Sequence, residues 1–368
     1  MPAATVRGMD LTASPKVLAR AAADLLRLLP GRTLDPVLSG VVLEADVDGV
    51  VLAGTDRERG VRLHRTARVH RAGRLLVPAR PLAEVLRHLD APEVRLVLEG
   101  SRLALRTPGA RFALPLLDLD AHPGVRAAPP ALGSLDTALL PRAAVVAGAA
   151  SRDDALPVFT GVHLTRRGDR LVLVGTDRFR MAVADLPWRP VAEGPDLLVP
   201  AGVLTEVSRQ AEGAEVVLHG DADRAGFGWP GAEVTTAVLD APFPDESRHL
   251  GAPFDGTVEL PAADLAAALR RVAPFAGPQA TVLLDVGDGE VRLRATGTGD
   301  ADESVKASTG GDRISTGYQP RYLADALGAF GSDRIRIGLR SGHRRATVLT
   351  TADPTAAHLH YVVMPKRL

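Results

Sequence analysis

The chain has 368 residues, and its 44 Lys and Arg residues balance its 44 Asp and Glu residues. It has no cysteine, which excludes disulfides, thiolate zinc sites, iron–sulfur clusters and a cysteine nucleophile. At about 150 residues per domain, this length predicts two or three domains. Neither a signal peptide nor an apolar run near the ~18 residues of a membrane span is present, so we expect a cytoplasmic protein.

The first predicted element is an amphipathic helix over residues 16–29. Ser14 is expected to cap it and Pro15 suits its first position. A hairpin follows, in which two short apolar strands flank the turn at Asp48-Gly49. A second helix over 80–89 carries an i, i+3, i+4, i+7 apolar face, and further alternating strands follow it.

The same succession of helix, strands, helix and strands occurs twice more along the chain. Linkers rich in Pro and Gly, over 122–134 and 244–256, separate the three successions. The remaining predicted helices cover 141–152, 201–211, 261–273 and 320–330. This order of elements predicts an α+β fold.

Repeated sequence markers show that the chain contains three copies of one unit. Gly54-Thr55-Asp56-Arg57 recurs 121 residues later, and Leu75 to Ala79 recurs 122 residues later. The segment Arg80 to Leu86 is echoed 241 residues later, at two units' distance. We therefore predict three domains at 1–125, 130–250 and 254–368.

Positive charge is concentrated in the six predicted helices. They carry eleven Lys and Arg residues against five Asp and Glu residues, although the whole chain is neutral. One interpretation is that these are ordinary solvated helix faces. The other is that the helices share a surface that meets the phosphates of a nucleic acid.

Four segments resemble one protein family, the bacterial sliding clamp, which is the β subunit of DNA polymerase III. The C-terminal Tyr361-Val362-Val363-Met364-Pro365-Lys366-Arg367-Leu368 is similar to that family's ending, and Leu239 to Asp245 is similar to its F-P-D segment. Thr176 to Ala182 resembles its T-D-x-x-R-[LM]-A strand, and Ser151 to Pro157 resembles the loop that enters domain two in actinobacterial members. The resemblance covers nearly the whole chain.

The resemblance implies three tandem sliding-clamp domains in a head-to-tail homodimeric ring, with helices lining the hole and strands outside. Such a ring encloses duplex DNA without regard to sequence and confers processivity on the replicative polymerase. Its implied partners are the polymerase III α subunit, the clamp loader and repair polymerases, all at the nucleoid. A clamp is not an enzyme, so we expect no catalytic residue, no metal and no cofactor.

The resemblance also implies a pocket between domains two and three that binds short linear peptide motifs. From the residues alone, Val362 and Val363 could equally be a core edge strand. Lys366 and His249 depart from the family's apolar residues and are expected to make the pocket more polar. The implied pocket residues are Phe159, Thr176, Arg178, Phe179, Arg180, Met181, Pro244, Arg248, His249, Val362, Val363, Met364, Pro365 and Arg367.

Two further sets of residues follow from the resemblance. Arg32 and Arg152 match loop arginines that contact DNA in the family, although each could be an exposed arginine without a partner. Phe112 and Leu114 of domain one are expected to meet Phe275 of domain three across the dimer junction.

Two alternatives to the clamp function stay open. A hydrolytic enzyme needs a catalytic site, yet the sequence contains neither a P-loop nor a nucleophile elbow. His358 with His360, and Asp153 with Asp154, are expected to be exposed side chains, although either pair could bind a metal. The other alternative has the same clamp fold but a different role. Zero net charge and the altered pocket positions fit an accessory clamp that tolerates a clamp-directed inhibitor or serves a specialised polymerase.

Overall fold

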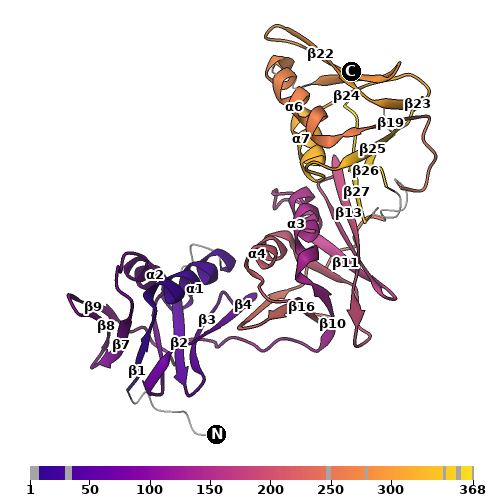
Figure 1. Ribbon diagram of the computed structural model, residues 1–368. Coiled ribbons are helices and arrows are strands. Elements are labelled where there is room, and N and C mark those ends of the chain that lie inside the picture. Colours follow the sequence, from indigo (N-terminus) through magenta and orange to yellow (C-terminus); the bar gives the residue numbers. More distant parts are fainter. Residues whose placement is uncertain are drawn as a thin grey trace. The chain divides into compact units, whose positions relative to one another are not determined.

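The computed structural model describes residues 8–29, 35–245, 250–277, 281–342, 345–353 and 358–366 (Figure 1). The chain divides into two compact units. Unit 1 comprises Met1–Ala138 and Arg189–Val238, and unit 2 comprises Leu139–Trp188 and Leu239–Leu368. The central third of the chain is therefore shared between both units. The three domain boundaries stay predictions.

All six predicted helices are present, with ends within three residues of the predicted ones. Pro15 occupies the first turn of the first helix as expected, but the Ser14 side chain makes no capping hydrogen bond. No helix in the described ranges has the length and apolarity that a membrane crossing requires. The helices are α1 (Pro15–Leu28), α2 (Ala79–Arg87), α3 (Leu140–Ala149), α4 (Ala201–Gln210), α6 (Ala262–Val272) and α7 (Pro320–Gly328), and the short 3₁₀ turns are η1 (Pro36–Ser39), η2 (Thr137–Leu139), η3 (Pro157–Thr160) and η4 (Ala273–Ala276).

Unit 1 contains two antiparallel sheets. One has the order β14-β10-β16-β17-β18-β4-β3-β2-β6 and the other the order β5-β1-β7-β8-β9. The predicted hairpin at Asp48-Gly49 is confirmed as β2 and β3. The strands are β1 (Asp10–Ala13), β2 (Gly40–Asp46), β3 (Gly49–Thr55), β4 (Arg59–Arg65), β5 (Arg68–Arg71), β6 (Gly73–Pro78), β7 (Val94–Glu99), β8 (Arg102–Thr107), β9 (Ala110–Pro115), β10 (Ala131–Asp136), β14 (Arg189–Pro190), β15 (Leu197–Pro200), β16 (Glu215–Gly220), β17 (Arg224–Trp229) and β18 (Ala232–Ala237).

Unit 2 repeats this plan. One sheet contains the succession β11-β12-β13-β27-β26-β25-β19-β23, and the other has the order β22-β21-β20-β24. The strands are β11 (Gly161–Arg167), β12 (Arg170–Thr176), β13 (Arg180–Pro187), β19 (Gly256–Pro261), β20 (Val282–Gly287), β21 (Glu290–Thr296), β22 (Asp300–Lys306), β23 (Ser308–Gly311), β24 (Ile314–Tyr318), β25 (Arg334–Leu339), β26 (Thr347–Thr351) and β27 (Leu359–Val363).

Each unit continues one sheet from one sequence repeat into the next. In unit 1, β4 pairs with β18, so that Val61 lies opposite Val234. In unit 2, β13 pairs with β27, so that Met181 lies opposite Val362. This pairing satisfies strand edges that would otherwise expose unpaired backbone groups.

Paired helices cover one face of the sheets. α1 packs beside α2 in unit 1 and α6 beside α7 in unit 2 (Figure 1). The apolar face of α1, including Leu18 and Leu25, is buried, as is the face of α6 that carries Leu265 and Leu269. Burial of these stripes is the main force that holds each helix on its sheet.

Candidate peptide-binding site

The candidate site is built on the sheet that joins β12 and β13 to β26 and β27 in unit 2. Successive side chains of a strand point to opposite faces. The alternate residues Val172 and Val174, Met181 and Val183, and Val362 gather on one face as a buried apolar cluster with Ala346 and Val348. The other face packs against α3 and α7. The expectation that Val362 and Val363 form an edge strand is wrong, because β27 is paired with both β13 and β26; Val362 also belongs to this apolar cluster.

Three partly buried side chains cover the apolar cluster. They are Phe243, Leu250 and Met364. Phe243 follows β18 in the chain and stacks on His163 of β11, with ring centroids 5.1 Å apart. The Met364 amide donates a hydrogen bond to the Phe179 carbonyl at 2.8 Å, which holds the C-terminal segment against the turn before β13.

That turn explains the repeated tetrapeptide Gly-Thr-Asp-Arg. In unit 2, the Thr176 hydroxyl donates to the Arg180 carbonyl at 2.6 Å and accepts from the Arg178 amide at 3.1 Å. The Asp177 carboxylate accepts from the amides of Phe179 and Arg180, both at 3.0 Å. The Thr and Asp side chains thus replace backbone partners in a tight turn. A Cβ at Gly175 would collide with the Val146 carbonyl, so only glycine fits there.

The turn holds Arg178 in an unusual backbone conformation. Its φ is +78°, in the left-handed region that non-glycine residues rarely adopt. The Arg178 guanidinium lies 5.9 Å from the Phe159 ring centroid and 5.8 Å from that of Phe179. Phe179 is 50% exposed and stacks on Tyr322 at 5.8 Å. We call Phe159, Arg178, Phe179 and Tyr322 the aromatic ledge.

Arg180 is mostly buried, although it also lines a cavity beside Phe179. The resemblance places it near a bound peptide, but its side chain is only 12% exposed. It donates to the Asp177 carboxylate at 3.1 Å, to the Gly148 carbonyl at 3.0 Å and to the Tyr361 hydroxyl at 3.4 Å, and it also pairs with Asp325. Four protein partners therefore occupy this guanidinium, which ties α3, α7 and β27 together.

A polar cavity of about 610 Å³ lies beside the aromatic ledge. Arg152 and Asp153 border it from the segment that follows α3, and Arg321, Tyr322 and Asp325 border it from α7. The last three residues were missed by the sequence analysis. Tyr322 could have indicated this site in the sequence, because an aromatic residue stands there where the matching segment of the first repeat has Pro81.

The backbone of Lys366 is hydrogen-bonded to β24. Its amide donates to the Gly317 carbonyl of β24 at 2.8 Å. Lys366 and Pro365 line a separate pocket of about 200 Å³ with Arg313 and Arg340.

The other predicted site residues are placed as follows. Pro244 is exposed next to Phe243, and Val363 is fully buried. Arg32, Arg248, His249 and Arg367 lie outside the described residues, and Arg152 is exposed.

The junction residues and the histidines can also be placed. Phe112 is 40% exposed on the edge strand β9, Leu114 beside it is buried, and Phe275 is 39% exposed in η4. Within the described ranges no group of three or more side chains could hold a metal ion. His358 was expected to be exposed, but its Nδ1 lies 2.9 Å from the Arg170 guanidinium. Burial lowers the pKa of its neighbour His360.

Ion pairs change the interpretation of the helix charges. Arg20 of α1 pairs with Glu212 at 2.6 Å, and Arg271 of α6 pairs with Glu303 of β22. Arg87 and Arg209 pair with carboxylates of their own helices. Part of the positive charge is thus neutralised locally.

Comparison with known families accounts for the repeat and the fold together. Family profiles for the N-terminal, central and C-terminal domains of the DNA polymerase III β subunit match residues 9–126, 137–245 and 251–367 in succession. The chain belongs to the DNA polymerase III β-subunit family, the bacterial sliding clamps. Members of this family are non-catalytic processivity factors that work with DNA and polymerases. The fold and the function implied by the sequence motifs are confirmed at this level.

Individual relatives agree with the family. The beta sliding clamp of Streptomyces coelicolor is 32% identical over 98% of this chain and 100% of its own length. The beta sliding clamp homolog GriR of Streptomyces muensis is 30% identical over 96% of this chain and 97% of its own. The sliding clamp of Pseudomonas aeruginosa, solved bound to griselimycin, is 25% identical with a TM-score of 0.90, covering 98% of this chain and 100% of that one.

Proposed function

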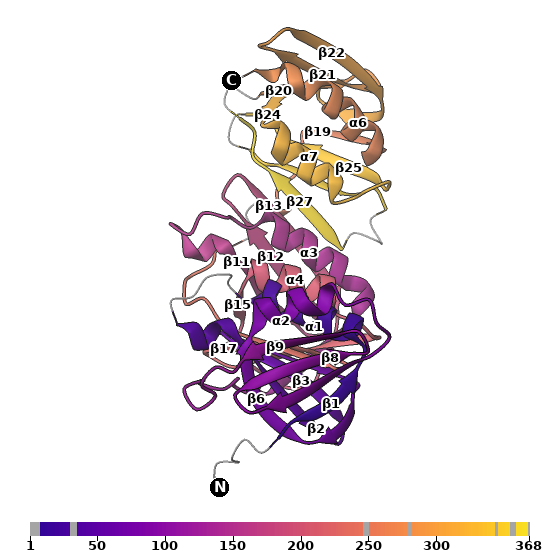
Figure 2. The same cartoon turned by 90° about the vertical axis from the view of Figure 1, so that its left-hand side faces the viewer.

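We propose that two copies of this chain close head to tail into a ring that encircles duplex DNA. The observation that carries this proposal is the use of strand edges. β4 pairs with β18 and β13 pairs with β27 at successive repeat boundaries. β9 and β22 each lie at one edge of their sheets, whose other edges are β5 and β24 (Figure 2). Pairing β9 of one copy with β22 of the other satisfies both edges and closes a twofold ring.

In such a ring, DNA is held by topology, so weak phosphate contacts suffice. We expect Arg152, Arg32 and exposed helix arginines to supply contacts that are independent of sequence and sensitive to salt. The chain itself would have no catalytic activity. We expect it to act at the nucleoid, in the cytoplasm.

The test uses a nicked circular duplex and a clamp loader. The chain should stay on the circle after gel filtration and leave it once a restriction enzyme cuts the circle, because a linear duplex has open ends. A short linear duplex should bind weakly at low salt and lose binding as salt rises. A sequence-specific footprint on linear DNA, or retention that survives linearisation, would contradict the ring.

We further propose that the apolar cluster under Met364, with the exposed Phe179 beside it, receives short peptide motifs of polymerases, loader and repair proteins. An extended peptide with apolar anchors suits a sheet face whose flexible Met364 can move aside. The Pseudomonas aeruginosa clamp, a protein of the same fold, binds griselimycin in its crystal structure, which supports a ligand site on this fold. Phe159, Thr176, Met181, Pro244, Val362 and Val363 would form or support this site, and Arg248, His249 and Arg367 are proposed to border it.

The aromatic ledge favours a second candidate function, an accessory clamp that tolerates a clamp-directed inhibitor. Phe179 is 50% exposed and contacts Arg178 and Tyr322. We propose that these side chains limit the binding of a ligand broader than an extended peptide. The relative named GriR is a clamp homolog of comparable length.

Calorimetry with griselimycin and with a linear Gln-x-x-Leu-Phe-like peptide separates the two functions. An accessory clamp should bind the linear peptide but not griselimycin, and Arg178→Gly should restore griselimycin binding. Arg57→Gly is the matched control, because Arg57 occupies the same turn in unit 1 with φ +84°. Equal wild-type affinity for both ligands would contradict the accessory function.

A further inference from the structure

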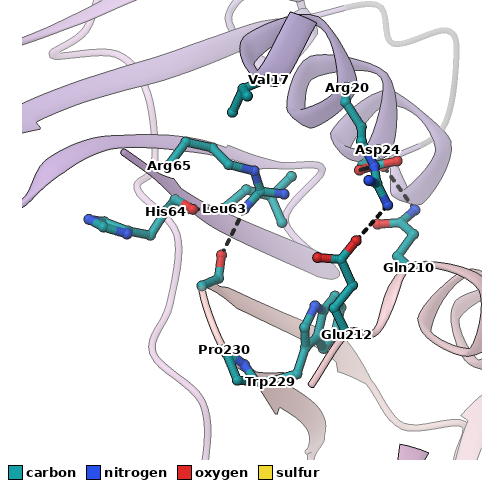
Figure 3. Close-up of a pocket in the computed structure, with 11 residues that line it drawn as sticks. Val17, Arg20, Asp24, Leu63, His64, Arg65, Gln210, Glu212, Trp229 and Pro230 are labelled. Carbon is teal, nitrogen blue, oxygen red and sulfur yellow. Dashed lines mark hydrogen bonds and ion pairs between the residues drawn. The ribbon is translucent and has the colours of Figure 1, made fainter. Parts of the chain in front are cut away.

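Unit 1 contains a polar pocket of about 330 Å³ that shares no residue with the proposed peptide site. It is formed by α1, the end of β4, the residues that end α4, and the turn between β17 and β18 (Figure 3). Trp229, Leu63 and Val17 provide apolar walls, of which Val17 is 41% exposed. The polar lining consists of Arg20, Asp24, His64, Arg65, Gln210 and Glu212.

Gln210 presents an unused hydrogen-bond acceptor to this pocket. Its side-chain amide orientation is defined, because Nε2 donates to the Asp24 carbonyl at 3.3 Å and to the Glu206 carboxylate at 3.0 Å. Its Oε1 has no hydrogen-bond partner among the described residues, although the residue is only 8% exposed. Figure 3 shows this oxygen on the pocket side of the amide. A buried acceptor without a partner typically costs about 1–3 kcal/mol, so a donor on a ligand would relieve it.

Arg65 supplies a positive charge without a carboxylate partner. Its Nη1 donates to the backbone carbonyls of His64 at 2.7 Å and Gly231 at 3.0 Å, which fixes the guanidinium at the pocket. In the described part of the chain, no carboxylate lies within ion-pair distance of it. Burial lowers the pKa of Arg65, as expected for a cation that is partly removed from water.

The two carboxylates of the pocket already have partners. Glu212 pairs with Arg20 at 2.6 Å, and Asp24 pairs with Arg27. They also place negative charge around Arg65, which disfavours a multiply charged anion such as phosphate relative to a single carboxylate. The pocket thus offers one cation, one acceptor and an apolar wall.

We propose that this pocket binds an N-acylated amino acid with an apolar side chain, as found at the C-terminus of a peptide. The α-carboxylate pairs with Arg65, the amide N–H donates to Gln210 Oε1, and the side chain packs on Trp229 and Val17. Each ligand group meets a protein group that lacks a partner of that kind. This site is separate from the apolar cluster of unit 2.

The test uses N-acetyl-L-leucine and the indole N–H signals of the intact protein in ¹H–¹⁵N spectra. The chain has only two tryptophans, Trp229 in the pocket and Trp188, whose Nε1 donates to the Gly168 carbonyl in unit 2. N-acetyl-L-leucine should shift the Trp229 signal saturably and leave Trp188 unchanged. N-acetyl-L-leucinamide, which lacks the carboxylate, should bind at least about tenfold more weakly, a difference of about 1.4 kcal/mol.

Substitutions of Arg65 test whether the shift of the Trp229 signal depends on this side chain. Arg65→Gln should abolish the shift, and Arg65→Lys should retain part of it, whereas Arg62→Gln removes an arginine from the opposite face of the same strand and should leave binding intact. A dispersed Trp229 indole signal before ligand is added shows in each case that unit 1 of the variant is folded, because Trp229 belongs to the same unit as Arg65. The proposal is overturned if N-acetyl-L-leucine gives no shift, if the amide binds equally well, if inorganic phosphate produces the same shift, or if binding survives in Arg65→Gln.

Discussion

At the scale of single residues, the clearest result is that a repeated tetrapeptide encodes a repeated turn. Thr55 and Thr176 each donate to the carbonyl four residues later, at 2.5 and 2.6 Å. In both turns the arginine that ends the tetrapeptide, Arg57 or Arg178, has a positive φ. The sequence match therefore reflects local backbone geometry. The aromatic contacts described for Arg178 belong to the second of the two turns.

Substitutions of Arg57 test this geometry apart from the peptide site. Glycine adopts a φ of +84° without steric cost, whereas a β-branched residue does not. We expect Arg57→Gly to unfold at the same urea concentration as wild type or higher, and Arg57→Val to lose about 1–3 kcal/mol of unfolding free energy. If Arg57→Val is as stable as Arg57→Gly, the left-handed turn is not present.

Two buried tyrosines predict a loss of stability at high pH. Burial raises the pKa of both Tyr318 and Tyr361 to about 12, from an ordinary value of 10. Between these values the unfolded chain releases protons that the folded chain keeps, so the unfolding free energy should fall as pH rises from about 10 to 12. Urea unfolding at pH 9 and pH 11 measures this fall.

The matched variant isolates one phenol from the other groups that titrate at high pH. In Tyr318→Phe the decrease between pH 9 and pH 11 should be smaller than in wild type. Tyr318 donates or accepts a hydrogen bond with Thr347 at 2.6 Å, so the variant also loses some stability at pH 9. An equal decrease in both proteins would show that Tyr318 does not ionise late.

At the scale of elements, connecting segments cover the helix-free faces of the sheets in both units. In unit 1, Leu117, Leu119 and Val125 follow β9 and pack on a cluster of Val42, Ala53 and Leu76. In unit 2, Phe243 and Leu250 follow β18 and pack on the larger cluster around Met181 and Val362, where Met364 also lies. A peptide that displaced Met364 would therefore reach an already formed apolar surface.

Truncation of Met364 tests this surface as a binding site. Met364→Ala should weaken binding of a Gln-x-x-Leu-Phe-like peptide by about 1 kcal/mol or more, because part of the anchor's apolar contact is lost. The control is Val37→Ala, which shortens a side chain packed on the corresponding cluster of unit 1. Calorimetry should show weaker binding only for the first variant. Equal affinities for Met364→Ala and wild type would place the peptide elsewhere.

At the scale of the whole molecule, the repeats are joined by two strand pairings, and β9 and β22 are among the strands that remain at sheet edges. β9 carries the exposed Phe112, and β22 alternates exposed and partly buried residues. The proposed ring uses both edges, so light scattering should give the mass of a dimer.

Phe112→Asp should shift this equilibrium toward the monomer, because a charge at the junction loses its hydration without gaining a partner. Val47→Asp is the matched control, since Val47 is 96% exposed in the turn between β2 and β3. A wild-type monomer at micromolar concentration, or equal dimerisation of both variants, would contradict the proposed junction.

The sequence by itself determined the α+β class, the threefold repeat and the six predicted helices that the described part of the chain contains. These properties depend on local periodicity and turn chemistry, which any stretch of about fifteen residues carries within itself. Only the tertiary structure decided which functional groups are available. Arg180 meets Asp325 and Tyr361 across more than a hundred residues, and the Lys366 amide bonds to the Gly317 carbonyl of β24. Such contacts depend on strand register between distant segments, because a shift of one residue would move each side chain to the opposite face of its sheet.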